Sequence, residues 1–211
     1  MKFYWVKTHW IIKYIFSKYI WSIHEKKQTV YLTFDDGPTP EVTAWTMAQL
    51  HQYCAKATFF CIGDNIQKHP ELFTNILSEG HAIGNHTFNH ANGWHTALED
   101  YITDVKDCEA EIRKLTNTSL LFRPPYGKLK FSQSQQLRKM GYKVIMWDIL
   151  SADFDTNISP QQCLDNVLKN ICPGSIVIFH DSVKAFKNLE YALPKTLQFL
   201  KKNGYECEVL S

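Results

Sequence analysis

Short apolar runs alternate with amphipathic stretches along most of this chain. The continuously apolar residues 57–62 predict a strand covered on both faces. Further strands are expected at residues 29–34, 82–84, 120–122, 143–147, 175–179 and 205–210, and helices at 39–52, 70–78, 96–115, 159–171 and 193–202. Strands that alternate with helices indicate right-handed βαβ units and a mostly parallel sheet.

Three of these helices carry start signals. Thr39 and Pro40 form an N-cap and first-turn proline, and Ser159 precedes Pro160 in the same way. Thr96 with Glu99 three residues later is a capping box, and the apolar spacing behind it predicts the longest helix.

Six or seven strand–helix units in 211 residues favour an α/β barrel over an open doubly wound sheet. We expect one domain, with the barrel over residues 29–211. In parallel barrels the chemistry gathers at the C-terminal ends of the strands.

Composition supports a globular chain, because 45% of the residues are hydrophobic and 21% are charged. A net charge of +2 gives little support to a nucleic-acid partner. The six cysteines are scattered without a CxxC pair, which favours free, mostly buried thiols over disulfides.

Residues 1–28 form a basic, aromatic segment in which Lys2, Lys7, Lys13 and Lys18 interrupt every apolar stretch. No stretch is long enough for a signal peptide or a membrane span, so a cytoplasmic location is the default expectation. Such a segment can lie on a membrane surface or pack across the open side of the barrel, and we favour packing.

Reactive side chains follow the predicted strands. Asp35 and Asp36 end the first strand, where neighbouring side chains point to opposite sides and can divide ligation from proton transfer. Paired aspartates before a Gly-Pro turn are also ordinary turn chemistry. His86 and His90 follow the third strand, at a spacing that suits a metal but is often incidental. With Asp36 they make the three-ligand set of a catalytic zinc, and cobalt, nickel and manganese accept the same ligands.

The later strands end in the same way. Arg123 is followed by two prolines. They either hold Arg123 in an extended conformation that directs its guanidinium toward a carboxylate, or serve only as a spacer in a loop. Trp147 and Asp153 follow the fifth strand, and His180 follows the apolar run 176–179.

Together these residues resemble the polysaccharide deacetylase family, the metal-dependent carbohydrate esterases that share the NodB homology domain. Five motif blocks of that family appear in order across residues 29–181. They are Thr33-Phe34-Asp35-Asp36-Gly37, His86-Thr87-x-x-His90, Arg123-Pro124-Pro125-Tyr126-Gly127, Asp153 and Ile178-x-His180.

The resemblance implies a distorted (β/α)7-type barrel and a role for each residue. Asp35 would be the general base, oriented by Arg123, and His180 the general acid, tuned by Asp153. The implied metal ligands are Asp36, His86 and His90.

The resemblance also implies that the Tyr126 backbone N–H helps to hold the oxyanion and that Trp147 lies near the substrate. Phe154 and Ile178 replace the family's usual Trp and Leu in the acetyl pocket, which leaves the shape of that pocket open.

The implied activity is removal of N-acetyl groups from sugars that contain N-acetylglucosamine: chitin oligosaccharides, peptidoglycan glycan or the free sugar. A deformylase of a lipid-linked amino sugar or a ring amidohydrolase would use the same site. A carbohydrate-binding module with lapsed catalysis is disfavoured by the intact set of aspartates and histidines.

Overall fold

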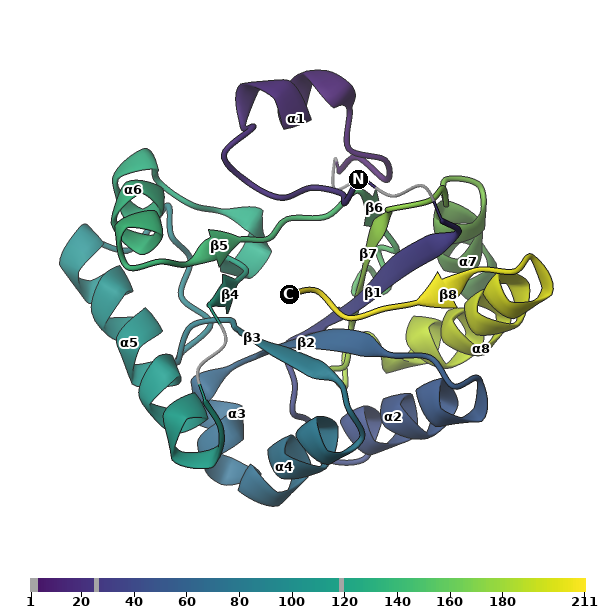
Figure 1. Cartoon of the computed structure of the whole chain (residues 1–211), viewed down its shortest axis with the longest axis horizontal. Coiled ribbons are helices and arrows are strands. Elements are labelled where there is room, and N and C mark those ends of the chain that lie inside the picture. Colours follow the sequence, from purple (N-terminus) through teal and green to yellow (C-terminus); the bar gives the residue numbers. More distant parts are fainter. Residues whose placement is uncertain (1–3, 25–26, 118–119) are drawn as a thin grey trace.

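A curved, parallel sheet with helices on its outer side forms the body of the molecule (Figure 1). The computed structural model describes residues 4–24, 27–117 and 120–211. The strands are β1 (Thr29–Asp35), β2 (Ala57–Cys61), β3 (Ala82–Asn85), β4 (Leu121–Phe122), β5 (Lys143–Val144), β6 (Ile149–Leu150), β7 (Ile176–His180) and β8 (Glu206–Cys207). Their order is β5-β4-β3-β2-β1-β7-β6, and β8 pairs with the start of β1. The predicted distorted barrel is confirmed.

Helices connect most successive strands, except β5 and β6, and surround the sheet (Figure 1). They are α1 (Trp10–Ile15), α2 (Val42–Gln52), α3 (Gly63–Lys68), α4 (Pro70–Ser78), α5 (Leu98–Leu115), α6 (Phe131–Lys139), α7 (Pro160–Leu168) and α8 (Phe186–Lys202), with a 3₁₀ turn η1 at Pro125–Gly127. All seven residues of β1 are buried, and Phe34 stacks between Phe59 and Phe179 in the main core. This central strand therefore holds the site residues at its end on a rigid base.

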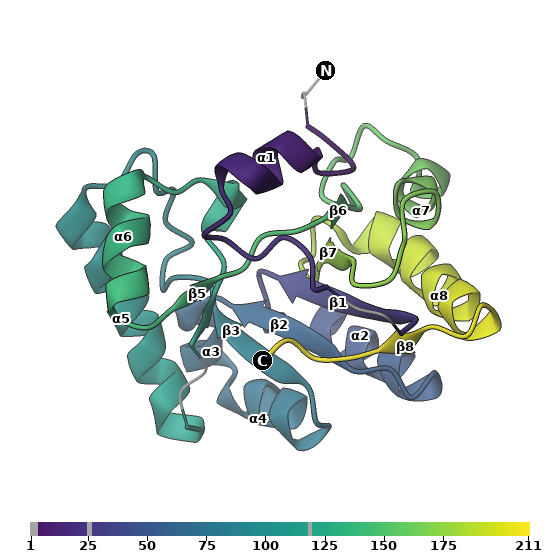
Figure 2. The ribbon, with the colours of Figure 1, turned by 45° about the horizontal axis from the view of Figure 1, so that its top comes forward.

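The N-terminal segment runs between β5 and β6, where the barrel is open (Figure 2). On one side Ile20 donates to the Val144 carbonyl at 2.9 Å. On the other, the Val6 carbonyl accepts from Leu150 at 2.8 Å, and Lys7 forms an antiparallel bridge with Ile149. We call residues 4–24 the N-terminal strap.

A buried carboxylate anchors this strap. Asp148 accepts hydrogen bonds from Lys7 Nζ and Lys13 Nζ, both at 2.6 Å, and from Ser175 Oγ at 2.7 Å. Burial disfavours its charge, but these three donors hold its pKa below the ordinary value. Lys7 and Lys13, two of the lysines that interrupt the apolar stretches of the strap, therefore have a structural role.

Two of the three predicted helix-start signals were wrong, whereas Ser159 does cap α7. Helix α2 begins at Val42 rather than directly after Thr39. The Thr39 backbone N–H donates to Thr43 Oγ1, so Thr39 lies in a turn that precedes the helix. At α5 no capping box forms: the N-cap is Ala97, and Thr96 Oγ1 donates instead to the Asn92 carbonyl.

The last helix begins at Phe186 rather than near residue 193 and carries Pro194 in its interior. A proline reads as a helix start in sequence, but the apolar residues Leu189, Ala192, Leu193 and Leu197 pack into the core and hold the helix together through it. The strands expected at 143–147 and 205–210 are two residues each. α1, α3 and α6 were not predicted.

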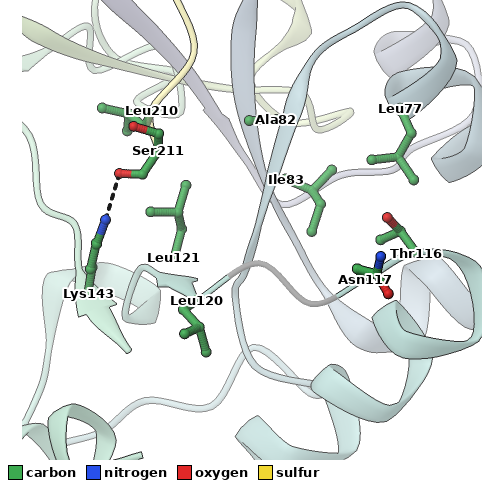
Figure 3. Close-up of a pocket in the computed structure, with 10 residues that line it drawn as sticks. All are labelled: Leu77, Ala82, Ile83, Thr116, Asn117, Leu120, Leu121, Lys143, Leu210 and Ser211. Carbon is green, nitrogen blue, oxygen red and sulfur yellow. Dashed lines mark hydrogen bonds between the residues drawn. The ribbon is translucent and has the colours of Figure 1, made fainter. Parts of the chain in front are cut away.

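All six cysteines are free thiols, but only Cys61, Cys108 and Cys163 are buried. Among the described residues, no helix combines the length and apolarity needed to cross a membrane. A cavity of about 350 Å³ lies at the N-terminal ends of β3, β4 and β5, where Lys143 Nζ donates to the Ser211 carbonyl at 3.0 Å (Figure 3). It is therefore at the opposite end of the sheet from the polar residues described next.

Candidate metal and catalytic site

A cavity of about 550 Å³ opens at the C-terminal ends of the strands. Nine of the side chains singled out in the sequence line it: Asp35, Asp36, His86, His90, Tyr126, Trp147, Phe154, Ile178 and His180. The other two, Arg123 and Asp153, are 0% exposed and contact Asp35 and His180 from behind. The structure thus brings all of them together.

Asp36, His86 and His90 form a compact cluster, in which one ligand atom from each lies within 4.8 Å of the others. Asp36 Oδ1 is 3.3 Å from His90 Nε2 and 3.7 Å from His86 Nε2. These separations leave room for an ion between the three atoms. Within the described residues this is the one such group of histidine, cysteine and acidic side chains.

The protonation states suit metal binding. His86 Nδ1 is 2.7 Å from the Arg123 carbonyl, which can only accept, so the proton is on Nδ1 and the Nε2 lone pair is free. Burial lowers the pKa of His86 to about 4, which keeps the ring neutral. Burial opposes ionisation of Asp36, but a hydrogen bond to His90 and the nearby histidines hold its pKa well below the ordinary value. A neutral His86 imidazole beside an ionised Asp36 carboxylate suits the binding of a divalent ion.

Tight loops aim these ligands. Asp36 has a positive φ of 84°, its carbonyl accepts from Asn65 Nδ2 at 2.7 Å, and the next amide, of Gly37, donates to Asp181 Oδ1 at 3.1 Å. His90 also has a positive φ, 56°, and its loop is closed by the Ala91 amide bonding to Thr87 Oγ1. Strained backbone of this kind persists where the surroundings fix it, which is typical of functional sites.

Arg123 joins two parts of the site. Its guanidinium NH1 donates to Asp35 Oδ1 at 2.7 Å and to Thr33 Oγ1 at 2.8 Å, while its carbonyl accepts from His86. NH2 donates to the Met146 carbonyl and the guanidinium lies over the Phe60 ring, so its position is fixed. Arg123 therefore orients one carboxylate and one imidazole from a single buried position.

His180 lies beside Asp35, because these two residues are register partners on β7 and β1. Burial opposes the charged ring, but Asp153, 2.7 Å from Nδ1, and the carboxylates of Asp36 and Asp35 raise the pKa of His180 to about 9. His180 thus stays protonated in neutral solution.

The remaining wall of the cavity is largely apolar. Trp147 fits closely over Gly127, where a Cβ would lie 2.7 Å from the indole ring. Phe154 meets the His180 ring edge-on, and Ile178 packs in a small cluster with Leu150. The centroid of the Tyr126 ring lies 4.5 Å from that of the His90 ring, and the Tyr126 backbone is left-handed, with a φ of 60°.

Two further residues of the site were not predicted from the sequence. Tyr4 lines the cavity from the N-terminal strap, and no motif marks it. Asp181 is buried behind the Asp36 turn and accepts from Gly37 N and Thr43 Oγ1, a role that its place next to His180 could have suggested. Burial raises the pKa of Asp181 to about 7, against the opposing hydrogen bond from Thr43.

Comparison with known proteins agrees with this geometry. Residues 22–145 match the family model described as polysaccharide deacetylase, which covers more than half of the chain. A peptidoglycan-N-acetylglucosamine deacetylase from Bacillus cereus is 35% identical over 192 residues, 90% of each chain. The chain belongs to the polysaccharide deacetylase family. As a member of this family it is a hydrolase of amide bonds, and the family is metal-dependent.

Other polysaccharide deacetylases extend the likeness. A chitooligosaccharide deacetylase from Azorhizobium caulinodans is 31% identical over 75% of this chain and 76% of that protein. The crystal structure of the Bc1960 peptidoglycan N-acetylglucosamine deacetylase superposes with a TM-score of 0.87 at 32% identity, covering 98% of this chain and 95% of that one.

Proposed function

We propose that this polysaccharide deacetylase removes N-acetyl groups from N-acetylglucosamine residues of a glycan, releasing acetate and a free amino sugar. One observation carries the proposal: the cluster of Asp36, His86 and His90 shares one cavity with Asp35 and His180, which are each held from behind by a buried partner, Arg123 and Asp153. A base and a separate acid beside a candidate metal site are what amide hydrolysis needs. Peptidoglycan glycan and chitooligosaccharides are the substrates named for the relatives.

The residues present fit a divalent ion, and zinc is our choice because two imidazoles and a carboxylate are a ligand set of catalytic zinc. Cobalt, nickel and manganese accept the same donors. Bound there, a divalent ion lowers the pKa of a water and polarises the amide carbonyl.

Asp35 acts as the general base in this proposal. Its Oδ1 is held by Arg123, and the other oxygen, Oδ2, lies 3.9 Å from His86 Nε2, toward the ligand cluster. Oδ2 can therefore take a proton from the attacking water while Oδ1 stays fixed.

His180 acts as the general acid. An amine is a poor leaving group, so the sugar nitrogen must be protonated as the carbon–nitrogen bond breaks. Asp153 fixes Nδ1, which leaves Nε2 to deliver that proton. Because Asp153 is fully buried, it stabilises the charged ring without reaching the substrate.

The carbonyl oxygen becomes negatively charged in the transition state, and we assign the Tyr126 backbone N–H to its stabilisation. Trp147, Phe154 and Ile178 line the apolar wall and would receive the acetyl methyl group.

The experiment that tests this function measures acetate and free amine from N-acetylchitooligosaccharides and from peptidoglycan glycan strands. We expect equimolar acetate and amine with purified protein and zinc. Formate from an N-formyl sugar without acetate from the N-acetyl sugars would replace this proposal with the deformylase alternative. Glycan binding without any amide hydrolysis would identify a binding protein instead.

A further inference from the structure

The N-terminal strap reaches the substrate cavity. Leu150 donates to the Val6 carbonyl and Thr8 donates to the Asp148 carbonyl, both at 2.8 Å. These two bonds fix the strap along β6. Tyr4, two residues before Val6, consequently lies in the wall of the cavity.

The cavity has a charged side and an apolar side. The charged side carries the candidate ligands, Asp35 and His180, whereas Leu150, Phe154 and Ile178 belong to the apolar side. Tyr4 is on the apolar side: it packs against the cluster of Leu150, Ala152 and Ile178, and its ring lies edge-on to Phe154 with centroids 6.0 Å apart. An N-acetyl group has the same division, with a polar amide on one side and a methyl on the other.

The Tyr4 ring is tied at its far end as well. Its hydroxyl donates to Asp155 Oδ2 at 3.1 Å, and Asp155 Oδ1 accepts from Asn157 Nδ2. A ring held by its hydroxyl, by Phe154 and by the paired strap cannot swing away at little cost. It is a fixed wall rather than a flexible cover.

We propose that Tyr4 is a specificity-determining residue, whose ring closes the apolar side of the cavity against N-acyl groups longer than acetyl. This inference rests on the proposed N-acyl hydrolysis. An acyl chain longer than acetyl would have to displace the Tyr4 ring, or its additional methylene group would not pack against the apolar residues of the cavity. An apolar pocket discriminates about 10- to 200-fold against one misplaced methylene, so the effect is measurable.

The test compares N-propionyl with N-acetyl chitotetraose as substrates of the zinc-loaded protein. Tyr4→Ala should raise the ratio of kcat/KM for propionyl over acetyl by about tenfold or more, because it removes the wall. Tyr4→Phe keeps the ring and should keep most of the wild-type ratio. Tyr14→Ala is the matched control, because Tyr14 lies on the same strap, is 78% exposed and does not line the cavity.

A binding measurement covers the case in which Tyr4→Ala loses turnover. In the Asp35→Asn background, calorimetric titration should show Tyr4→Ala improving the affinity for the propionyl sugar relative to the acetyl sugar. The inference would be overturned if, in Tyr4→Ala, the propionyl-to-acetyl ratios of kcat/KM and of affinity both stayed within twofold of wild type. An equal loss of activity on the two substrates would overturn it as well. If wild type released acetate in that experiment, the proposed function would still stand. If wild type hydrolysed neither amide, the proposed function would fail and the binding ratio would still decide the role of Tyr4.

Discussion

Asp153 binds His180 twice, accepting from the ring Nδ1 and from the backbone N–H of the same residue, both at 2.7 Å. The double contact fixes ring orientation and places a buried negative charge beside the imidazole. Positioning and charge are therefore supplied by one side chain that never meets the substrate.

The first prediction concerns this pair. Asp153→Asn should move the alkaline limb of the kcat/KM pH profile downward by about one to two units, because the carboxylate that raises the pKa of His180 is removed. The ring then loses its proton at lower pH, and activity is lost sooner on the alkaline side. Asp165→Asn, which removes a surface carboxylate paired with Lys169, is the control and should leave the profile unchanged. An alkaline limb that did not move in Asp153→Asn would contradict the proposed coupling.

The second prediction separates the adjacent aspartates. Asp36→Asn should lower the zinc retained per chain, because it removes a ligand. Asp35→Asn should keep the zinc but reduce kcat by about 10²- to 10⁴-fold, because it removes the base. Metal analysis after dialysis, alongside initial rates, distinguishes the two. The reverse pattern, with zinc lost only in Asp35→Asn, would exchange the two roles.

Asp35→Asn also leaves Arg123 buried beside a neutral partner. We expect a lower free energy of unfolding in this variant, because a buried guanidinium loses its counter-charge. Thermal unfolding should accompany the rate measurement, so that rates are compared only between folded proteins.

The third prediction concerns the strap. Asp148→Ala should lower the free energy of unfolding by about 2–3 kcal/mol, because two lysines and Ser175 lose a buried acceptor. The folded pKa of Asp148 is depressed, so its contribution is present above the unfolded pKa of about 4 and is lost as the pH falls through the folded value. Denaturant unfolding of both proteins should therefore differ at pH 7 and converge in acid. Equal stabilities at pH 7 would show that the anchor contributes nothing.

The fourth prediction tests the turn behind Asp36. An alanine Cβ at residue 37 would lie 2.0 Å from Asp181 Oδ2, so Gly37→Ala must shift the loop that aims Asp36. We expect zinc retention to fall even though no ligand is replaced. Gly204 has open space around it and a positive φ of 72°, so Gly204→Ala should change stability without changing zinc retention. Normal zinc content in Gly37→Ala would show that Asp181 does not set the position of Asp36.

The sequence predicted which candidate site residues come together better than it predicted the boundaries of the elements. Asp35 and His180 end buried strands, His86 and Arg123 directly follow two others, and the parallel sheet brings these strand ends to one edge. The burial pattern of the strands was therefore enough to gather them.

Local signals failed where tertiary contacts compete with them. Thr96 was read as a helix cap, but its hydroxyl bonds to Asn92 and its carbonyl accepts from Lys130. The last helix was predicted only from residue 193, but packing continues α8 on both sides of Pro194. Neither competing partner can be seen in a local window of sequence.

The position of Tyr4 could not be predicted from the sequence for a different reason. Its place in the cavity depends on the pairing of Val6 with Leu150, two residues 144 positions apart, and on Lys7 and Lys13 reaching Asp148. The pattern of basic residues between aromatic ones does not indicate that Asp148 is the partner of the two lysines. Contacts across the opening of a barrel have no periodic signature.

The most direct test of the account measures acetate release against the zinc bound per chain. Wild-type protein is freed of metal by chelation and reloaded in steps with N-acetylchitotetraose present, and His86→Ala is treated in the same way. We predict that the rate rises in proportion to zinc up to one ion per chain, and that His86→Ala retains little zinc and releases no acetate. Full acetate release by the metal-free protein, or by His86→Ala, would contradict the account.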